Sequence, residues 1–224
     1  MAKVDDITKG EKVQKKVTEF LNSNVKILIC VGVALLLLIG ILWLIIGLSD
    51  RASTAHQIKI DELQNSYRNY FYSSEKSDEE LSALKGELQK LASKKKGSYP
   101  YLKAQYLLAM IAYDEGSYSE ASDLFVSVSE KGQKTYLASL ALFNAAVSKE
   151  VDGDIQSALE YYQNVYDKFG SDAPEAPKAL YNIARLHENS GDLELAKAFL
   201  QQLADEYPYS EYGKLAKSKV AMMP

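Results

Sequence analysis

The chain has 224 residues, a formal net charge of −4 and a single cysteine. An acidic chain disfavours binding to nucleic acid, which generally requires a basic surface. One cysteine cannot form an internal disulfide, and a well-packed helical domain does not need one.

Residues 27–48, ILICVGVALLLLIGILWLIIGL, contain no charged side chain. A helix of this length spans ~33 Å, about the hydrocarbon thickness of a bilayer. Because backbone polar groups in lipid must be paired within the segment, we predict a transmembrane helix over 27–48. A cleaved signal peptide is the alternative, since Ala52, Ser53 and Ala55 are small. However, its apolar core is usually shorter and lies closer to the N-terminus.

Residues 1–26 form a basic tail that we expect on the cytoplasmic side. Positive residues flanking a membrane span tend to stay in the cytoplasm. The tail has six lysines: Lys3, Lys9, Lys12, Lys15, Lys16 and Lys26. The twenty positions after Leu48 have only three basic residues: Arg51, Lys59 and Arg68. This asymmetry predicts a C-terminal domain outside the membrane, in the periplasm of a bacterium.

Residues 49–97 are predicted to form a helical neck after the membrane span. A first helix is expected over about 53–72. Ser77 and Glu80 then form a capping-box pattern at the start of a second helix. The apolar stripe of that helix consists of Leu81, Leu84, Leu88 and Leu91. The sequence KKKG at 94–97 ends the pattern and predicts a joint.

Three segments of the C-terminal domain share one pattern: GSYSEASDLF at 116–125, GDIQSALEYY at 153–162 and GDLELAKAFL at 191–200. Each begins with Gly and has an apolar residue two positions later, Ala five later and a large apolar residue nine later. The alanines Ala121, Ala158 and Ala196 are 37 and 38 residues apart. A period of this length indicates a helical repeat array.

Each position of the pattern has a physical role. The Gly ends a helix in a left-handed conformation, and the next apolar residue (Tyr118, Ile155 or Leu193) packs the turn. The Ala lets two antiparallel helices approach closely, beside the large residue four positions later (Phe125, Tyr162 or Leu200). A further apolar stripe precedes each Gly. Each unit is therefore predicted to be a helix, a Gly turn and a second helix.

These segments resemble the tetratricopeptide repeat (TPR) over residues 100–208, with Pro208 at the closing proline position of that family. The first helices depart from the family pattern. Gln105, Phe143 and Leu180 replace its Trp, and Ala109, Val147 and Ala184 replace its small Gly. Ser210 is expected to cap a last helix that covers the end of the array. The predicted fold is all-α, with about three repeats and a C-terminal capping helix over 98–224.

The resemblance implies a concave binding surface built from the first helix of each repeat. The groove positions of the family fall on Lys103, Tyr106, Met110, Tyr113, Asn144, Ser148, Val151, Lys178, Tyr181, Arg185 and Glu188. This mixture suits an extended peptide or a helix better than a charged chain terminus. The alternative is that Tyr106, Tyr113 and Tyr181 only pack between repeats.

No constellation of catalytic or metal-binding residues is found in the sequence. The two histidines, His56 and His187, are far apart, and no phosphate-binding loop or zinc spacing occurs. His187 is expected to be a packed or capping side chain. We therefore expect no enzyme activity, cofactor, metal or small-molecule substrate, and partners that are other proteins and the bilayer.

The layout of tail, anchor, neck and TPR array is similar to YfgM-type proteins, the ancillary subunit of the bacterial Sec translocon. The resemblance implies a role in protein export or folding beside the translocon, with periplasmic chaperones. The C-terminal motif YPYSEYGKLAK at 207–217 also looks like the Tol-associated cell-division coordinator and the outer-membrane assembly lipoprotein. A scaffold subunit of an envelope machine, such as a flagellar motor, is a further alternative, and a membrane protein that regulates an enzyme is a weaker one.

Overall fold

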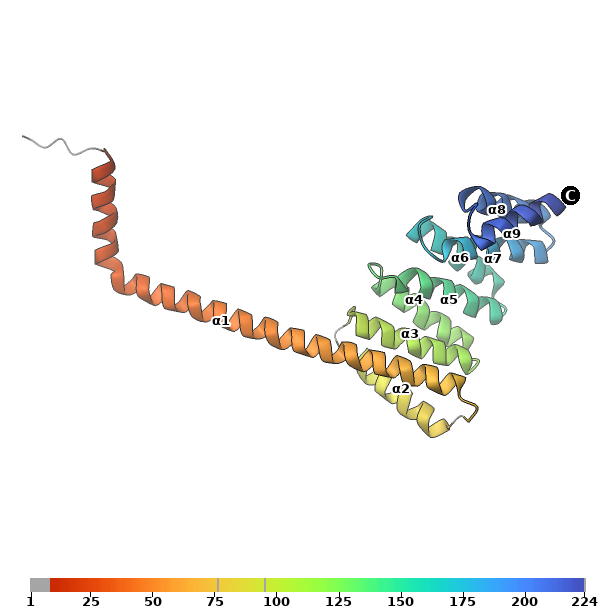
Figure 1. Cartoon of the computed structure of the whole chain (residues 1–224), viewed down its shortest axis with the longest axis horizontal. Helices are drawn as coiled ribbons and strands as arrows, with labels where there is room; N and C mark the ends of the chain where they lie inside the picture. The colour runs from red at the N-terminus through yellow and green to blue at the C-terminus, as the bar shows by residue number, and fades with distance from the viewer. Residues whose placement is uncertain (1–8, 76, 95, 224) are drawn as a thin grey trace, which may run out of the picture. The chain divides into compact units, whose positions relative to one another are not determined.

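The structure is a computed structural model that describes residues 9–75, 77–94 and 96–223. Within these residues it is entirely helical, with nine α-helices (Figure 1). The helices are α1 (Lys9–Tyr72), α2 (Asp78–Ala92), α3 (Tyr99–Asp114), α4 (Tyr118–Lys131), α5 (Leu137–Val151), α6 (Ile155–Phe169), α7 (Ala176–Asn189), α8 (Leu193–Glu206) and α9 (Glu211–Met222).

The chain divides into two units, Met1–Ala55 and His56–Pro224. The first contains most of α1. No single helix of the described residues combines the length and hydropathy of a membrane span. Two successive helical segments, Lys12–Ile27 and Ile29–Leu44, reach that standard only together, with a bend of 60° between them. The structure thus does not support one uninterrupted span over 27–48, and the anchor stays a prediction.

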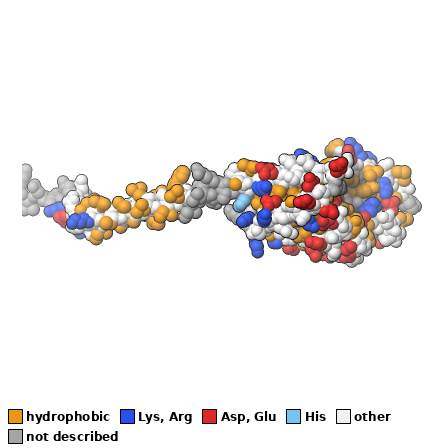
Figure 2. Space-filling model, turned by 90° about the horizontal axis from the view of Figure 1, so that it is seen from below, with side chains coloured by type: hydrophobic (Ala, Val, Ile, Leu, Met, Phe, Trp, Pro, Cys, Tyr) orange, Lys and Arg blue, Asp and Glu red, His pale blue; other side chains and the backbone are white. Residues whose placement is uncertain are grey.

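From Ile27 to Leu44, apolar side chains make up the described surface of the first unit. Leu36 and Trp43 are 70% and 75% exposed, and Cys30 is exposed as well. In Figure 2, hydrophobic side chains are seen along the helix of the first unit, next to a group of basic side chains. A helix that exposes this much apolar surface needs an apolar environment to cover it.

The second unit is a stack of helical hairpins. Helices α3 and α4, α5 and α6, and α7 and α8 pair, and α9 packs on α8. The core consists of successive layers between neighbouring hairpins. Phe125 lies in the layer with α3 and α5, Tyr162 in the layer with α5 and α7, and Leu200 in the layer that reaches α9. This layering is typical of an α-solenoid, in which each repeat contacts only its neighbours.

The helices predicted as a neck share a core with the array. Ile60 of α1 and Leu88 of α2 are fully buried and pack in one cluster with Leu107 and Ile111 of α3. The predicted cap of α2 is confirmed, because the Ser77 side chain accepts a hydrogen bond from the backbone N–H of Glu80. Residues 56–72 and α2 therefore cover the first face of the stack as an additional helical pair.

The repeat pattern is confirmed at its key positions. Gly116, Gly153 and Gly191 have φ angles of 81°, 88° and 85°, a region that glycine adopts without strain. The three alanines of the pattern are fully buried, and Phe125, Tyr162 and Leu200 are each 1% exposed. The predicted close contact between the two helices of each hairpin is thus present in all three repeats.

The turn position of the pattern behaves differently from the prediction. Tyr118 contacts Tyr113 across the turn, but Ile155 and Leu193 are 41% and 44% exposed. In these two repeats the residue before, Asp154 or Asp192, organises the turn. Its carboxylate accepts a hydrogen bond from the backbone N–H three residues later and caps the second helix.

A close backbone approach at Gly213 gives a test of how α9 docks. The Ser210 side chain caps α9, as predicted, and a Cβ at Gly213 would lie 1.9 Å from the carbonyl oxygen of Tyr207. We expect Gly213→Ala to lower the free energy of unfolding by about 1–3 kcal/mol. Urea unfolding followed by circular dichroism measures this change.

Gly86 of α2 provides the matched control. A Cβ there meets no atom within 4 Å, so Gly86→Ala should stabilise the protein by about 0.5–1 kcal/mol through helix propensity. Equal effects of the two substitutions would contradict the docking of α9 described above.

Candidate protein-interaction surface

Side-chain contacts join each first helix of the stack to the next one. Tyr67 of α1 donates a hydrogen bond to Asp114 of α3, with 3.0 Å between the oxygens. Asn144 of α5 donates from Nδ2 to the Tyr106 hydroxyl of α3 at 2.7 Å. At the start of the same helices, the hydroxyls of Tyr99 and Tyr136 are 2.9 Å apart. We call the contacts between helices α1, α3, α5, α7 and α9 the first-helix ladder.

The ladder continues between α5 and α7 through two carboxylates. Ser139 donates to Glu175 at 2.6 Å. Arg185 donates from Nη2 to both oxygens of Glu150, at 2.8 and 2.7 Å. Tyr162, from α6, donates to the same Glu150 carboxylate at 3.1 Å. A half-buried carboxylate with three charge-assisted contacts holds three helices in a defined arrangement.

The last step of the ladder joins α7 to the terminal helix α9. Tyr181 contacts Tyr212, with 5.4 Å between ring centroids. Lys219 pairs with Glu188, and its ammonium lies 5.9 Å from the centre of the Tyr181 ring. The predicted capping role of the last helix is therefore supported by ionic, aromatic and apolar contacts together.

Most of the side chains predicted to bind a partner take part in contacts within the chain. Tyr106 and Ser148 are buried, and the Ser148 hydroxyl donates to the backbone carbonyl of Asn144. Lys103 is also buried, and its ammonium lies 5.4 Å from the centre of the Tyr106 ring. The structure thus brings the α3 and α5 members together, while Arg185, Glu188 and Tyr181 of α7 contact α5 and α9.

Four of the predicted residues remain available to another molecule, and one of them, Val151 at the end of α5, is 48% exposed. Lys178 is exposed, and Met110 and Tyr113 are half-buried. Neither the Tyr113 hydroxyl nor the Lys178 ammonium makes a hydrogen bond or ion pair with a described residue. An apolar thioether, a phenol and a free ammonium can contact both the apolar and the polar parts of a polypeptide.

Burial changes the acidity of the ladder tyrosines. Desolvation raises the pKa of Tyr106 to about 12, and the nearby Glu175 carboxylate acts in the same direction. The pKa of Tyr162 rises further, because burial and the Glu150 carboxylate both oppose its ionisation. The pKa of Tyr113 is also raised, first by burial. All three phenols are therefore neutral hydrogen-bonding groups at physiological pH.

The family-based prediction did not include Glu150, Tyr162, Glu175 or Lys219. One signal could have found several ladder contacts, because the partners are about one repeat apart: 37 residues for Tyr99 and Tyr136, 36 for Ser139 and Glu175. His187 is a packed side chain, as predicted. Its ring stacks on Phe199 at 5.7 Å between centroids.

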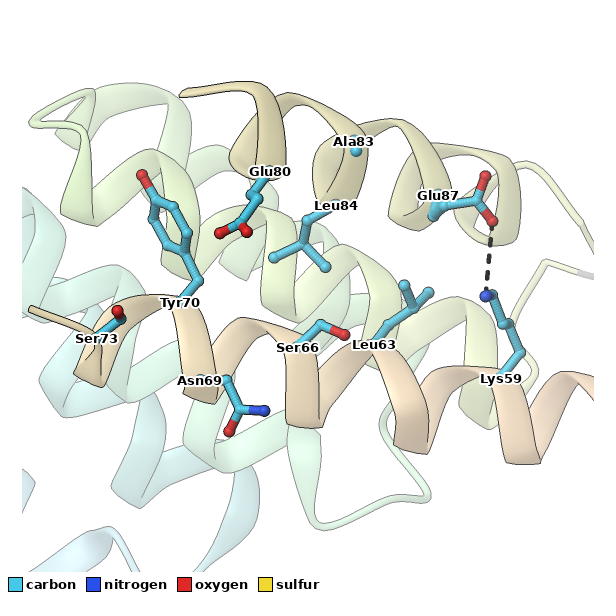
Figure 3. Close-up of a pocket in the computed structure, with 10 residues that line it drawn as sticks. All are labelled: Lys59, Leu63, Ser66, Asn69, Tyr70, Ser73, Glu80, Ala83, Leu84 and Glu87. Carbon is cyan, nitrogen blue, oxygen red and sulfur yellow. Dashed lines mark ion pairs between the residues drawn. The ribbon is translucent and has the colours of Figure 1, made fainter. Parts of the chain in front are cut away.

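A groove of about 550 Å³ lies between the second part of α1 and α2 (Figure 3). Leu63 and Leu84 face it together with Ser66 and Glu80. An ion pair between Lys59 and Glu87, 3.9 Å apart, lies at one end. The lining offers hydrogen bonds and apolar contact, and the sequence prediction did not include it.

Comparisons with known proteins identify the class of the repeats. The sequence profile of the tetratricopeptide repeat matches residues 152–219, which contain α6, α7, α8 and most of α9. A second profile, of a domain of unknown function (DUF6340), matches residues 108–176. None of the curated proteins matches the chain by sequence.

Two solved structures resemble this fold. Both contain the TPR-like repeats of a Podosopora anserina protein described as a kinesin light chain, and these repeats are described as nearly identical to one another. One of the two structures carries a single substitution. Each has a TM-score of 0.54 and 14% sequence identity, and covers 76% of this chain and 85% or 86% of its own. At this identity the likeness shows the fold alone. The chain is thus a TPR-like repeat protein, as the sequence predicts.

Alkaline pH should destabilise the protein through its buried tyrosines. The folded-state pKa of Tyr106, about 12, lies above the ordinary value of ~10. The stabilisation is therefore fully present below pH ~10 and is lost as the pH rises towards ~12. In this window each such tyrosine should lower the free energy of unfolding by about 1.4 kcal/mol per pH unit.

Urea unfolding at several pH values between ~8 and ~11.5 measures this slope. Tyr106→Phe should reduce it by about 1.4 kcal/mol per pH unit. Tyr209→Phe, at a ring that is 92% exposed, controls for the substitution itself. Identical slopes in the wild type and Tyr106→Phe would show that folding does not raise the pKa of Tyr106.

Proposed function

We propose that the chain is a single-pass, membrane-anchored interaction module whose TPR-like domain faces the periplasm. In this proposal it assists protein export or folding beside the Sec translocon, together with periplasmic chaperones. The observation that carries the proposal is the combination of an uncharged apolar segment with a stack of TPR-like repeats in one chain. The anchor localises the module, and the repeats bind proteins.

The anchoring part rests on residues 27–48. The side chains described there are exposed and apolar, and transfer of such a surface from water to lipid is strongly favourable. The excess of lysines before the segment favours a cytoplasmic N-terminus. No polar or ionisable group in the segment suggests transport through it.

The binding part rests on the first-helix surface, the side of α3, α5 and α7 that carries the predicted groove residues. TPR-like folds are typically interaction scaffolds, and Met110, Tyr113 and Lys178 remain accessible on α3 and α7. Their chemistry suits an extended peptide or an amphipathic helix of a client protein. We do not assign a catalytic role to any residue. A structural scaffold subunit of an envelope machine is the alternative function, since the same architecture serves both.

Substitution of the accessible residues should weaken partner capture without unfolding. We expect the double variant Met110→Ser and Lys178→Glu to retain less than about a tenth of the captured partner, because removal of one or two central contacts typically costs about 1–2 kcal/mol or more. Affinity purification in mild detergent with quantitative mass spectrometry measures the loss.

Lys168→Glu on the second helix α6 is the matched control, since Lys168 is also exposed. It should capture the wild-type amount of partner. Tyr106 and Arg185 are unsuitable test positions because they hold α3, α5 and α7 together. Undiminished capture by a folded double variant would exclude this surface as the binding site.

Photocrosslinking tests the proposed location. A photoreactive amino acid at Leu36 or Trp43, both exposed, should crosslink to a translocon subunit in intact cells. Extraction of the membranes with alkaline carbonate tests the anchor, and should leave the chain in the membrane fraction. Crosslinks to motor or division proteins would favour the scaffold alternative. Release by carbonate would contradict the anchor itself.

A further inference from the structure

The segment Lys12–Ile27 has an apolar face that no described residue of the first unit covers. Val13, Val17 and Phe20 follow one another at spacings of four and three residues, which places them on one side of a helix. Val13 is 62% exposed and Phe20 is 61% exposed, and Leu21 beside them is exposed as well. An apolar stripe of this kind requires either a partner surface or lipid.

The opposite side of the same helix is basic. Between residues 12 and 27 there are four lysines and one acidic residue, Glu19. On a helical projection, Lys15 and Lys26 lie on the side away from Phe20, and Lys12 and Lys16 lie towards the edge of the apolar face. A lysine at such an edge can cover apolar surface with its stem and extend its ammonium to a headgroup.

One polar side chain on the apolar face bonds within the helix. Asn24 projects to the same side as Val13 and Val17, and its amide donates to the backbone carbonyl of Phe20 at 2.9 Å. This bond lowers the penalty for placing the Asn24 side chain at an apolar boundary.

The bend gives this segment its own direction. The axis of Lys12–Ile27 is turned by 60° from that of Ile29–Leu44. Two such segments cannot both run along the bilayer normal. An amphipathic helix with a basic polar face is the type that lies in the plane of the interface.

We propose that Lys12–Ile27 lies in the headgroup layer of the cytoplasmic leaflet, with Val13, Val17 and Phe20 in the acyl boundary and the lysines on anionic phospholipid headgroups. This inference rests on the proposed membrane anchor over 27–48, which holds the helix at the bilayer surface. The net positive charge matches the negative potential of that leaflet.

Lipid suits this face better than a second copy of the chain. A stable coiled coil requires apolar heptad positions over about three to four heptads, and this segment has about two before the bend. The polar face is also dominated by lysines, so two parallel copies would bring like charges together, whereas anionic headgroups neutralise them.

The experiment uses the full chain in vesicles of phosphatidylcholine and phosphatidylglycerol. Because Cys30 is the only cysteine, Cys30→Ser gives a cysteine-free background. Single cysteines then carry a spin label at Val17 or Phe20 on the apolar face, at Lys15 or Asn22 on the polar face, and at Leu36. Accessibility to oxygen and to a water-soluble nickel complex reports the depth of each label.

We expect the labels at positions 17 and 20 to lie ~5–10 Å below the headgroups and those at positions 15 and 22 to face water. Equal water access at all four positions would overturn the proposal. A steady increase in depth from position 15 to position 22 would also overturn it, because it would mean that the segment is part of a broken span. Spin–spin broadening at positions 17 and 20 without oxygen access would overturn it as well, because it would mean that a second copy of the chain covers this face. A water-exposed label at Leu36 would instead refute the anchor.

The role of the lysines is tested separately. Replacement of Lys12, Lys15 and Lys16 by Gln should move the labels at positions 17 and 20 towards water, as should vesicles of phosphatidylcholine alone. The control replaces Lys94, Lys96 and Lys214, which are exposed in the second unit, and should leave the depth unchanged. Unchanged depth in the first variant would overturn the headgroup contacts.

Discussion

The close approach of two helices at one small side chain is the constraint on which each hairpin depends. Ala121, Ala158 and Ala196 are fully buried, and a larger side chain there would force the helices apart. A glycine five residues earlier reverses the chain with a positive φ, as at Gly153. The Gly–Ala pattern thus specifies the turn of a hairpin and the close contact of its two helices together. Stacking follows, because each hairpin alone leaves an apolar face in water.

The first-helix ladder then sets how one hairpin sits on the next. Apolar layers tolerate small rotations, whereas a hydrogen bond such as that from Asn144 to Tyr106 requires a defined distance and direction. The Glu150 carboxylate adds a stronger constraint, because loss of Arg185 would remove its only charged partner among the described residues and leave a partly buried charge with a single hydrogen bond from Tyr162. In related repeats the side of the first helices is available to partners. Here part of it is occupied by the ladder contacts, which fix the curvature of the stack.

Local features of the fold were predictable, and relations between helices were less so. The Gly–Ala pattern and the caps at Ser77 and Ser210 depend on neighbouring residues, and the sequence shows them directly. Periodicity finds the apolar face of α2 but not the helix that covers it, so 49–97 was interpreted as a neck. The pairing of Glu150 with Arg185 depends on how far α5 and α7 are shifted along their axes relative to each other. No proline marks the bend between Ile27 and Ile29, so nothing in the sequence indicated it, and the apolar run predicted one helix over 27–48.

The small accessible part of the first-helix surface has a consequence for binding. With Tyr106 and Arg185 used within the stack, Met110, Tyr113 and Lys178 offer a modest contact area, which is typical of transient rather than permanent complexes. In the proposed anchored state, such weak contacts are sufficient. A tether at the membrane surface confines the module near clients that emerge there, and raises their effective concentration to about the millimolar range. Capture then depends on location as much as on affinity, and release remains fast.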